Sequence, residues 1–432
     1  MRKLWSCALA LALVLTIAGC GAQDLSSDAD SSEAPFTPRL DPETTCSVNV
    51  VGNYRNFESL EAEFDRFNAC YPNVELSYTF LDKYNSTIGP ALKGEDAPDI
   101  YCMFRWMVDR ENWKDLFDSA EDLSDPALGI DLGCVREGLL YRSEEGHVPM
   151  APVFSTTYGM LVNEDLFKRE GLEIPANYGE LIAVCETLKE RGYPSPVMGH
   201  NSSLHLFYPL AYPFFCATLR DQPETVAALN AMEPSSAEAM RSTLELVQDF
   251  FSRGAVDLSA CSALEDNYQA VILRFFEGDV PMMFVPGDTV SGTQKRESLS
   301  EAYMKHPFTY SFHPVPSTET GGFFLNVSGI NFAVNRKSDN LEMANEFMRF
   351  LICTEELNLM AQNKRLMTVS TDFSLDGVYA SFGLVPADHC IYEQELGLLD
   401  DPAVQLRIAC WQVGNKIASI DEAIAGFGTL TE

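Results

Sequence analysis

The chain has 432 residues, a formal net charge of −33 at pH 7, and 46% hydrophobic residues. This length allows two or three domains with large cores, at about 100–200 residues per domain. The acidic excess argues against nucleic acid as a partner, because binding phosphates needs clustered Lys and Arg.

The N-terminal residues have the pattern of a secretory signal. Two basic residues precede a short apolar run that ends at Ile17-Ala18-Gly19-Cys20, and this ending resembles the bacterial lipobox, whose cysteine is diacylated after cleavage. We therefore expect a lipoprotein signal peptide at 1–19 and a lipid anchor on Cys20, at the extracellular face of a bacterial cell membrane. The alternative is an ordinary signal peptide. No later stretch has the roughly 18 apolar residues that span a membrane.

The cysteines leave two readings open. Of twelve cysteines, Cys7 and Cys20 lie in the signal region, so ten remain. An even number in an exported protein permits disulfides, but several lie in apolar surroundings, where a free thiol behaves as a small hydrophobe. No Cys or His spacing is typical of a metal site, so we expect no metal and no cofactor.

Residues 20–45 are rich in Ser, Asp, Glu and Pro and predict a flexible tether. A strand at 47–51, a helix from Phe57 to about Phe67, and strands at 74–80 and 99–104 follow. This strand–helix–strand order predicts a parallel sheet covered by helices.

A second series of elements follows, so we expect an α/β protein with more than one sheet. The strands are predicted at 159–162, 281–285 and 328–334, and the helices at 163–171, 178–191, 240–251, 268–276, 340–352 and 355–363.

Five segments, in this order, resemble motifs of the family-1 extracellular solute-binding proteins of ABC importers. They are Phe67-Asn-Ala-Cys-Tyr-Pro-Asn-Val74, Ala97-Pro-Asp-Ile100, the segment from Tyr158 to Pro175, Phe276-Glu-Gly-Asp-Val-Pro-Met-Met283, and the segment from Met343 to Leu351. The chain departs from the family pattern at Val162, Asn177-Tyr178 and Pro281, which affects the subfamily and ligand rather than the fold.

The resemblance implies a two-lobed periplasmic-binding-protein fold, type II-like and similar to maltose-binding protein. It implies three interlobe crossings, expected near 152–157, 285–287 and 326–329. Lobe one would be 46–154 with 288–328, and lobe two 155–287 with 329–432. The ligand would lie in the cleft between lobes that close by hinge bending.

A sugar cleft needs aromatic rings and a few oriented polar groups, in loops that follow strands or at the crossings. Three of the candidates also have a purely structural interpretation: Trp106 as a core residue, Arg105 as part of a surface ion pair, and Asp288 as a turn residue. The predicted ligand-binding residues are Tyr54, Phe104, Arg105, Trp106, Ser155, Thr156, Tyr158, His205, Tyr208, Asp288, Asn326 and Ser328.

These observations predict a monomeric, non-enzymatic binding protein that captures a mono- or oligosaccharide and delivers it to the membrane subunits of an ABC permease. Three alternatives remain. The same fold could bind a peptide or polyamine, the chain could be a secreted hydrolase with a carboxylate pair, or it could be an adhesin or sensor partner that binds sugar without a permease.

Overall fold

The computed structural model describes residues 36–54, 57–104, 107, 118–265, 268–372 and 375–432. The predicted signal peptide and Cys20 lie outside these described residues. Contacts divide the chain into residues 1–37 and residues 38–432, and the second unit carries the fold that follows. Within the described residues, no helix has the length and apolar character needed to cross a membrane.

The first lobe is built on a five-stranded sheet with the order β2-β1-β3-β13-β4. The predicted parallel arrangement is confirmed, because β1 pairs in parallel with both β2 and β3. Its strands are β1 (Cys46–Gly52), β2 (Val74–Phe80), β3 (Ile100–Met103), β4 (Ala151–Pro152) and β13 (Asn331–Val334), and its helices are α1 (Glu58–Asn68), α2 (Tyr84–Ala91), α14 (Leu341–Leu351) and α15 (Thr354–Lys364).

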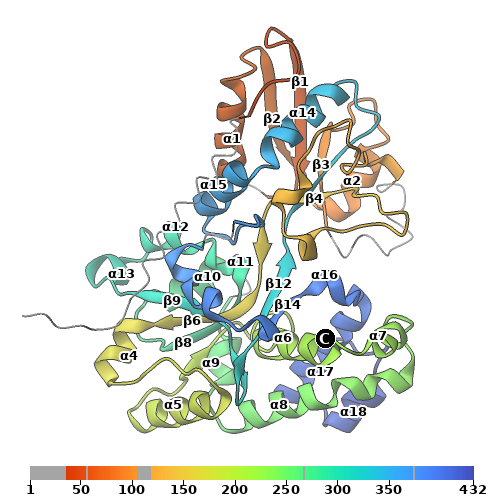
Figure 1. Ribbon diagram of the computed structural model, residues 1–432. Coiled ribbons are helices and arrows are strands. Elements are labelled where there is room, and N and C mark those ends of the chain that lie inside the picture. Colours follow the sequence, from red (N-terminus) through yellow and green to blue (C-terminus); the bar gives the residue numbers. More distant parts are fainter. Residues whose placement is uncertain (1–35, 55–56, 105–106, 108–117, 266–267, 373–374) are drawn as a thin grey trace, which may run out of the picture. The chain divides into compact units, whose positions relative to one another are not determined.

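The second lobe is built on a four-stranded sheet with the order β7-β8-β6-β9, in which β6 is antiparallel to β8 and β9. Its strands are β6 (Tyr158–Asn163), β7 (Val197–Met198), β8 (Met282–Pro286) and β9 (Tyr310–His313). Its helices are α4 (Glu164–Glu170), α5 (Tyr178–Glu190), α6 (Tyr208–Leu219), α7 (Pro223–Asn230), α8 (Arg241–Ser252), α9 (Leu258–Ser262), α10 (Tyr268–Phe275), α11 (Gly287–Val290), α12 (Thr293–Glu297), α13 (Glu301–Lys305), α16 (Glu393–Leu396), α17 (Asp400–Gly414) and α18 (Ile420–Ala425). Figure 1 shows the first-lobe elements in the upper part of this unit and the second-lobe elements below.

Two small sheets complete the fold. The three-stranded sheet β14-β12-β5 consists of β14 (Cys390–Tyr392), β12 (Phe324–Ser328) and β5 (Ser155–Thr156), and the hairpin consists of β10 (Pro316–Thr318) and β11 (Gly321–Gly322). The single strand predicted at 328–334 is two strands, because β12 ends at Ser328 and β13 begins at Asn331 in a different sheet.

The chain passes between the lobes at about 153–157, 328–331 and 365–370. The first two crossings lie close to those expected near 152–157 and 326–329, whereas the third was expected near 285–287. No crossing occurs after β8, because the N–H of Gly287 donates to the carbonyl oxygen of Thr157 (2.7 Å) and α11 stays with the second lobe. The structure therefore allocates the C-terminal half differently from the prediction. Strand β9 pairs with β6 of the second lobe, and β13, α14 and α15 belong to the first lobe.

Capping residues define the predicted helix after β6. The side chain of Asn163 accepts a hydrogen bond from the N–H of Leu166 (2.9 Å) and begins α4. Gly171, with a φ of 62°, ends the helix in the left-handed region that favours glycine. The predicted bounds of 163–171 are confirmed to within a residue at each end.

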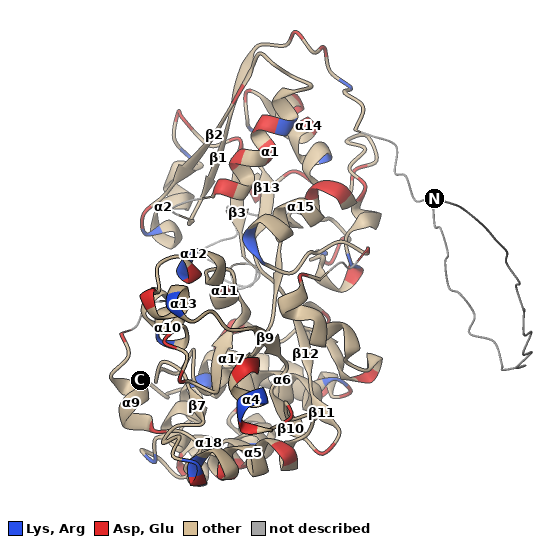
Figure 2. Ribbon diagram, turned by 90° about the vertical axis from the view of Figure 1, so that its left-hand side faces the viewer, with Lys and Arg blue, Asp and Glu red and all other residues tan. Residues whose placement is uncertain are grey.

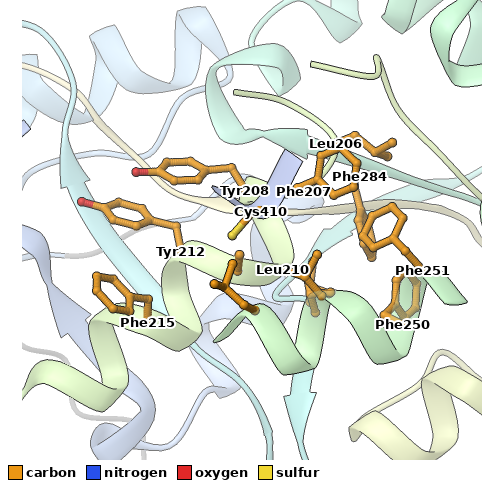
Figure 3. Close-up of a cluster of buried hydrophobic side chains, with 14 of the residues drawn as sticks. Leu206, Phe207, Tyr208, Leu210, Tyr212, Phe215, Phe250, Phe251, Phe284 and Cys410 are labelled. Carbon is orange, nitrogen blue, oxygen red and sulfur yellow. The ribbon is translucent and has the colours of Figure 1, made fainter. Parts of the chain in front are cut away.

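The core of the second lobe lies where α6, α8 and α17 pack on β6 and β8 (Figure 3). Helix α6 was not predicted, because it is apolar on nearly all sides and therefore lacks the period that marks an amphipathic helix. Phe250 stacks on Phe284 with ring centroids 5.5 Å apart, and Phe207 lies 4.4 Å from Phe251. The second contact holds the start of α6, because Phe207 directly precedes this helix, which carries part of the site described below.

We expect Gly414→Ala to lower the free energy of unfolding by about 1–3 kcal/mol through overpacking. A Cβ at Gly414 would lie 2.1 Å from Cε1 of the buried Phe207 ring, which Phe251 holds in place. Urea unfolding measures the loss. Gly377→Ala is the matched control, because a Cβ there meets nothing within 4 Å, and equal stability of the two variants would contradict the prediction.

In the part of the chain that the structure describes, none of the ten cysteines from Cys46 to Cys410 is joined in a disulfide. Of the two alternatives that the sequence leaves open, the structure therefore has thiols rather than disulfides. Burial raises the pKa of Cys102 and of Cys185 to about 12, so these groups stay protonated and pack as small apolar side chains.

Charge is spread over the surface, as the sequence predicts. Figure 2 shows Asp and Glu recurring on helices of both lobes rather than in a single block.

Candidate functional site

Two adjoining cavities lie between the lobes. The first chamber, of about 270 Å³, is lined by Asn53, Tyr54, Phe104, Phe154, Ser155, Thr156, Thr157, Tyr158, Leu204, Pro286, Asp288, Gly329, Ile330 and Leu366. The second chamber, of about 200 Å³, is lined by Phe104, Tyr158, Leu204, Tyr208, Tyr212, Val327, Ser328, Gly329, Glu393, Leu398, Leu399, Asp400, Ala403 and Arg407. Four residues line both chambers, so the two form one interlobe cleft.

The fold brings these side chains together at the ends of strands. Tyr54 follows β1 and Phe104 follows β3, at the carboxyl end of the parallel part of the first sheet, where open α/β sheets place ligands. Asp288 follows β8, and Ser155 and Thr156 form β5 at a crossing. Both lobes therefore contribute walls to the cleft.

Three tyrosines form an aromatic wall on the second-lobe side. The rings of Tyr208 and Tyr212 stack with centroids 4.3 Å apart, and the Tyr158 ring meets both edge-on at 5.1 Å and 5.6 Å. Burial raises the pKa of Tyr208 and of Tyr212, so both hydroxyls stay neutral. Figure 3 shows these two side chains pointing the same way from α6.

The first-lobe side carries a second aromatic group. The Tyr54 ring stacks on Phe57 with centroids 5.4 Å apart, and its backbone N–H donates to the Tyr78 hydroxyl at 3.0 Å. Burial and, second, the charge of Asp288 raise the pKa of Tyr54. The hydroxyl is thus a neutral donor and acceptor across the chamber from a carboxylate.

Charged groups are concentrated in the second chamber. The Tyr212 hydroxyl donates to Oε1 of Glu393 at 2.6 Å, and Asp400 and Arg407 line the same chamber. The Nε of Arg407 is buried with no hydrogen-bond partner among the described residues. A planar guanidinium in this state can donate to a pair of oxygens on a bound molecule.

The structure brings eight of the predicted site residues into the cleft: Tyr54, Phe104, Ser155, Thr156, Tyr158, Tyr208, Asp288 and Ser328. Arg105 and Trp106 lie outside the described residues. His205 and Asn326 are not among the lining residues.

Internal hydrogen bonds explain the last two positions. Asn326 is 1% exposed, and its Oδ1 accepts from Arg136 at 2.6 Å, so its amide turns away from the cleft. The Nδ1 of His205 lies 2.8 Å from the Ser202 hydroxyl oxygen.

Sequence reasoning missed five lining residues of the second chamber that are suited to ligand contact: Leu204, Tyr212, Glu393, Asp400 and Arg407. One signal was available for Tyr212, because it lies one helical turn after Tyr208 and such residues share a face. No signal was available for the other three polar residues, which reach the cleft from α16 and α17 only through tertiary packing.

Comparisons with known proteins agree with this architecture. Residues 52–356 match the family described as bacterial extracellular solute-binding protein. No curated protein matches the sequence significantly.

Among solved structures, the chain is similar to the solute-binding protein RafE in complex with raffinose, with a TM-score of 0.68 at 15% identity, covering 89% of this chain and 98% of that one. RafE has also been solved in its apo form, from Streptococcus pneumoniae. The chain is likewise similar to a Bacillus licheniformis sugar transporter in complex with stachyose, with a TM-score of 0.61 at 15% identity and coverage of 88% and 97%. For the GacH receptor of Streptomyces glaucescens, the TM-score is 0.66 at 16% identity, with coverage of 89% and 97%.

At these identities the structures establish a shared fold. The family match spans well over half of the sequence, and the two lobes with an interlobe cleft fit it. The chain belongs to the family of bacterial extracellular solute-binding proteins.

Proposed function

We propose that this protein captures an oligosaccharide in the interlobe cleft and delivers it, unchanged, to an ABC permease. The observation that carries the proposal is the pair of adjoining chambers with the Tyr158–Tyr208–Tyr212 wall on one side and Tyr54 on the other. Flat rings pack on the apolar C–H faces of sugars, and the surrounding carboxylates, hydroxyls and guanidinium pair with sugar hydroxyls. The sugars found in complex with similar proteins, raffinose and stachyose, support the same class.

The length of the cleft favours more than one sugar unit. Phe104, Tyr158, Leu204 and Gly329 border both chambers, so a ligand that fills the first chamber and continues past Tyr158 reaches Arg407 in the second. A monosaccharide fills only one chamber, and water fills the other.

One observation favours a second candidate, a polyamine. Glu393 and Asp400 lie beside the tyrosine wall, and aromatic faces with carboxylates also suit ammonium groups. Arg407 in the same chamber opposes this, because a guanidinium repels a cationic ligand.

We further propose that the protein acts as a monomer outside the cytoplasm, held to the membrane by lipid on Cys20 and a tether at 20–45. The lipobox-like sequence supports the anchor, and the family match supports extracellular binding as its task.

A thermal-shift panel tests the ligand class. It contains raffinose, stachyose, maltotriose, their monosaccharides, short peptides and spermidine. A ligand at 100 times its dissociation constant adds about 2.7 kcal/mol of stability, so we expect a clear rise in Tm with at least one oligosaccharide. Stabilisation by spermidine or a peptide alone would leave the fold intact and overturn the sugar proposal.

A further inference from the structure

We infer that Arg136 is a positioning residue that joins the three interlobe crossings, so that they bend as one hinge. It lies outside the cleft, in a segment of the chain that precedes all three crossings. The inference rests on the proposed function only in that hinge bending is how the cleft would close on its ligand.

The guanidinium of Arg136 contacts two crossings directly and, at the third, the strand that leads into it. Its Nη1 donates to Oδ1 of Asn326 in β12 at 2.6 Å. Its Nη2 donates to the hydroxyl oxygen of Ser155 in β5 at 2.9 Å and to the carbonyl oxygen of Thr368 at 2.5 Å. Ser155 and Thr368 lie in the crossings at about 153–157 and 365–370, and Asn326 lies on β12, two residues before the crossing that begins at Ser328.

The acceptors are themselves held in place. Ser155 and Asn326 are each 1% exposed. The N–H of Ser155 donates to the carbonyl oxygen of Met367 at 3.0 Å, and the Asn326 amide donates to that of Ile391 at 3.2 Å. The backbone N–H of Arg136 donates to the carbonyl oxygen of Val369 at 2.9 Å. One crossing therefore cannot shift without straining the bonds that the guanidinium makes to the other two.

The chemistry explains why arginine suits this position. Its planar fork presents several donors in fixed directions, whereas a lysine ammonium is a point charge on a flexible stem and cannot satisfy three separated acceptors equally well. Burial lowers the pKa of Arg136, but an arginine stays charged in proteins. Hydrogen bonds from a charged donor are also stronger than neutral ones.

The hydrogen bonds of Arg136 connect to the cleft, because Ser155 lines the first chamber and Ser328, two residues after Asn326, lines the second. Arg136 thus sets how the two cleft walls lie in the ligand-free protein.

Hydrogen–deuterium exchange of the ligand-free protein tests the inference. We expect Arg136→Gln to speed exchange about tenfold or more in all three crossings, since each loses a bond to a charged donor, while the core of the two large sheets stays protected. The reporter amides are Val153 and Ser155 in the first crossing and Gly329 in the second, which donate to the carbonyl oxygens of Ile330, Met367 and Phe154. The reporter in the third crossing is the amide of Ser370, which donates to the hydroxyl oxygen of Thr368 at 3.1 Å. Arg142→Gln is the matched control, because Arg142 makes an exposed ion pair with Glu137 (2.7 Å).

Faster exchange only next to residue 136 would overturn the inference, because a local contact would then explain the effect of the substitution. Faster exchange uniformly through both lobes would also overturn it, because a general loss of stability would then explain the effect. If Arg136→Gln does not fold, hydrogen–deuterium exchange of Arg136→Lys tests the inference instead. Faster exchange in all three crossings is expected, and exchange at the wild-type rate would contradict the inference. No ligand is present in this experiment, so failure of every sugar in the thermal-shift panel would leave its result unaffected.

Discussion

Replacing Glu63 with Gln is expected to make the protein more stable above about pH 6, by about 2 kcal/mol or more at pH 8. Glu63 lies on α1 with no exposed surface and faces Glu356 on α15. Burial, and then the neighbouring Glu356 carboxylate, raise the pKa of Glu63 to about 9, although Arg66 opposes the shift. The folded protein therefore holds a proton at neutral pH that the unfolded chain releases.

The sign of the pH dependence follows from this difference in bound protons. A carboxyl with a raised pKa in the folded state costs no stability below its unfolded pKa, near 4.5. Between that pH and about 9, the free energy of unfolding falls by up to about 1.4 kcal/mol per pH unit, because the unfolded state binds fewer protons. Glutamine has the same shape and binds no proton, so this loss disappears in the variant.

Urea unfolding of the wild type and of Glu63→Gln from pH 5 to pH 9 measures the effect, and the difference should widen with pH. Glu61→Gln is the matched control, because Glu61 is exposed on the same helix. Parallel pH profiles for the wild type and Glu63→Gln would show that Glu63 is already ionised in the folded protein, contrary to the expectation.

Replacing Tyr158 with Ala is expected to weaken sugar binding by about 30-fold or more, the size of effect seen for central aromatic contacts in binding sites. The Tyr158 ring borders both chambers and meets Tyr208 and Tyr212 edge-on. Its removal takes away a packing surface for the ligand and the support of the stacked pair. Tyr158→Phe keeps the ring and should retain most of the affinity.

Titration calorimetry with the sugar that stabilises the protein most measures this loss. Tyr193→Ala is the control for removing a tyrosine elsewhere, since the Tyr193 hydroxyl donates to Glu170 (2.7 Å) away from the cleft. Equal affinities of the Tyr158 and Tyr193 variants would place the binding site elsewhere.

Local patterns were sufficient to predict the first three elements of the first lobe. Strands β1 and β2 and helix α1 lie within about a residue of their predicted bounds, because their apolar residues repeat with a clear period. Helix α6 has no such period, since nearly every position is buried. Its absence from the prediction follows from its place at the centre of a core.

The lobe to which a segment belongs is a tertiary property. The predicted change of lobe after β8 does not occur, because the hydrogen bond from Gly287 to Thr157 and the packing of α11 keep the chain in the second lobe. Neither partner is near the other in sequence, and the order of strands and helices is the same for both arrangements.

The same distinction holds for the site. The rule that ligands lie after strands led to Tyr54 and Phe104, which line the cleft. The amide of Asn326 is drawn inward by Arg136, 190 positions earlier in the chain, and Arg407 reaches the second chamber from α17. Such long-range pairings leave no trace in a single sequence.

The most direct test of the sugar-binding proposal is a calorimetric titration of the purified protein with raffinose, stachyose and maltotriose, followed by chromatography of the recovered sugar. We predict one site per chain for at least one of these sugars, loss of that binding in Tyr158→Ala, and recovery of the sugar intact. Cleavage of the sugar, or binding that Tyr158→Ala leaves unchanged, would contradict the account of a protein that captures an oligosaccharide between its lobes.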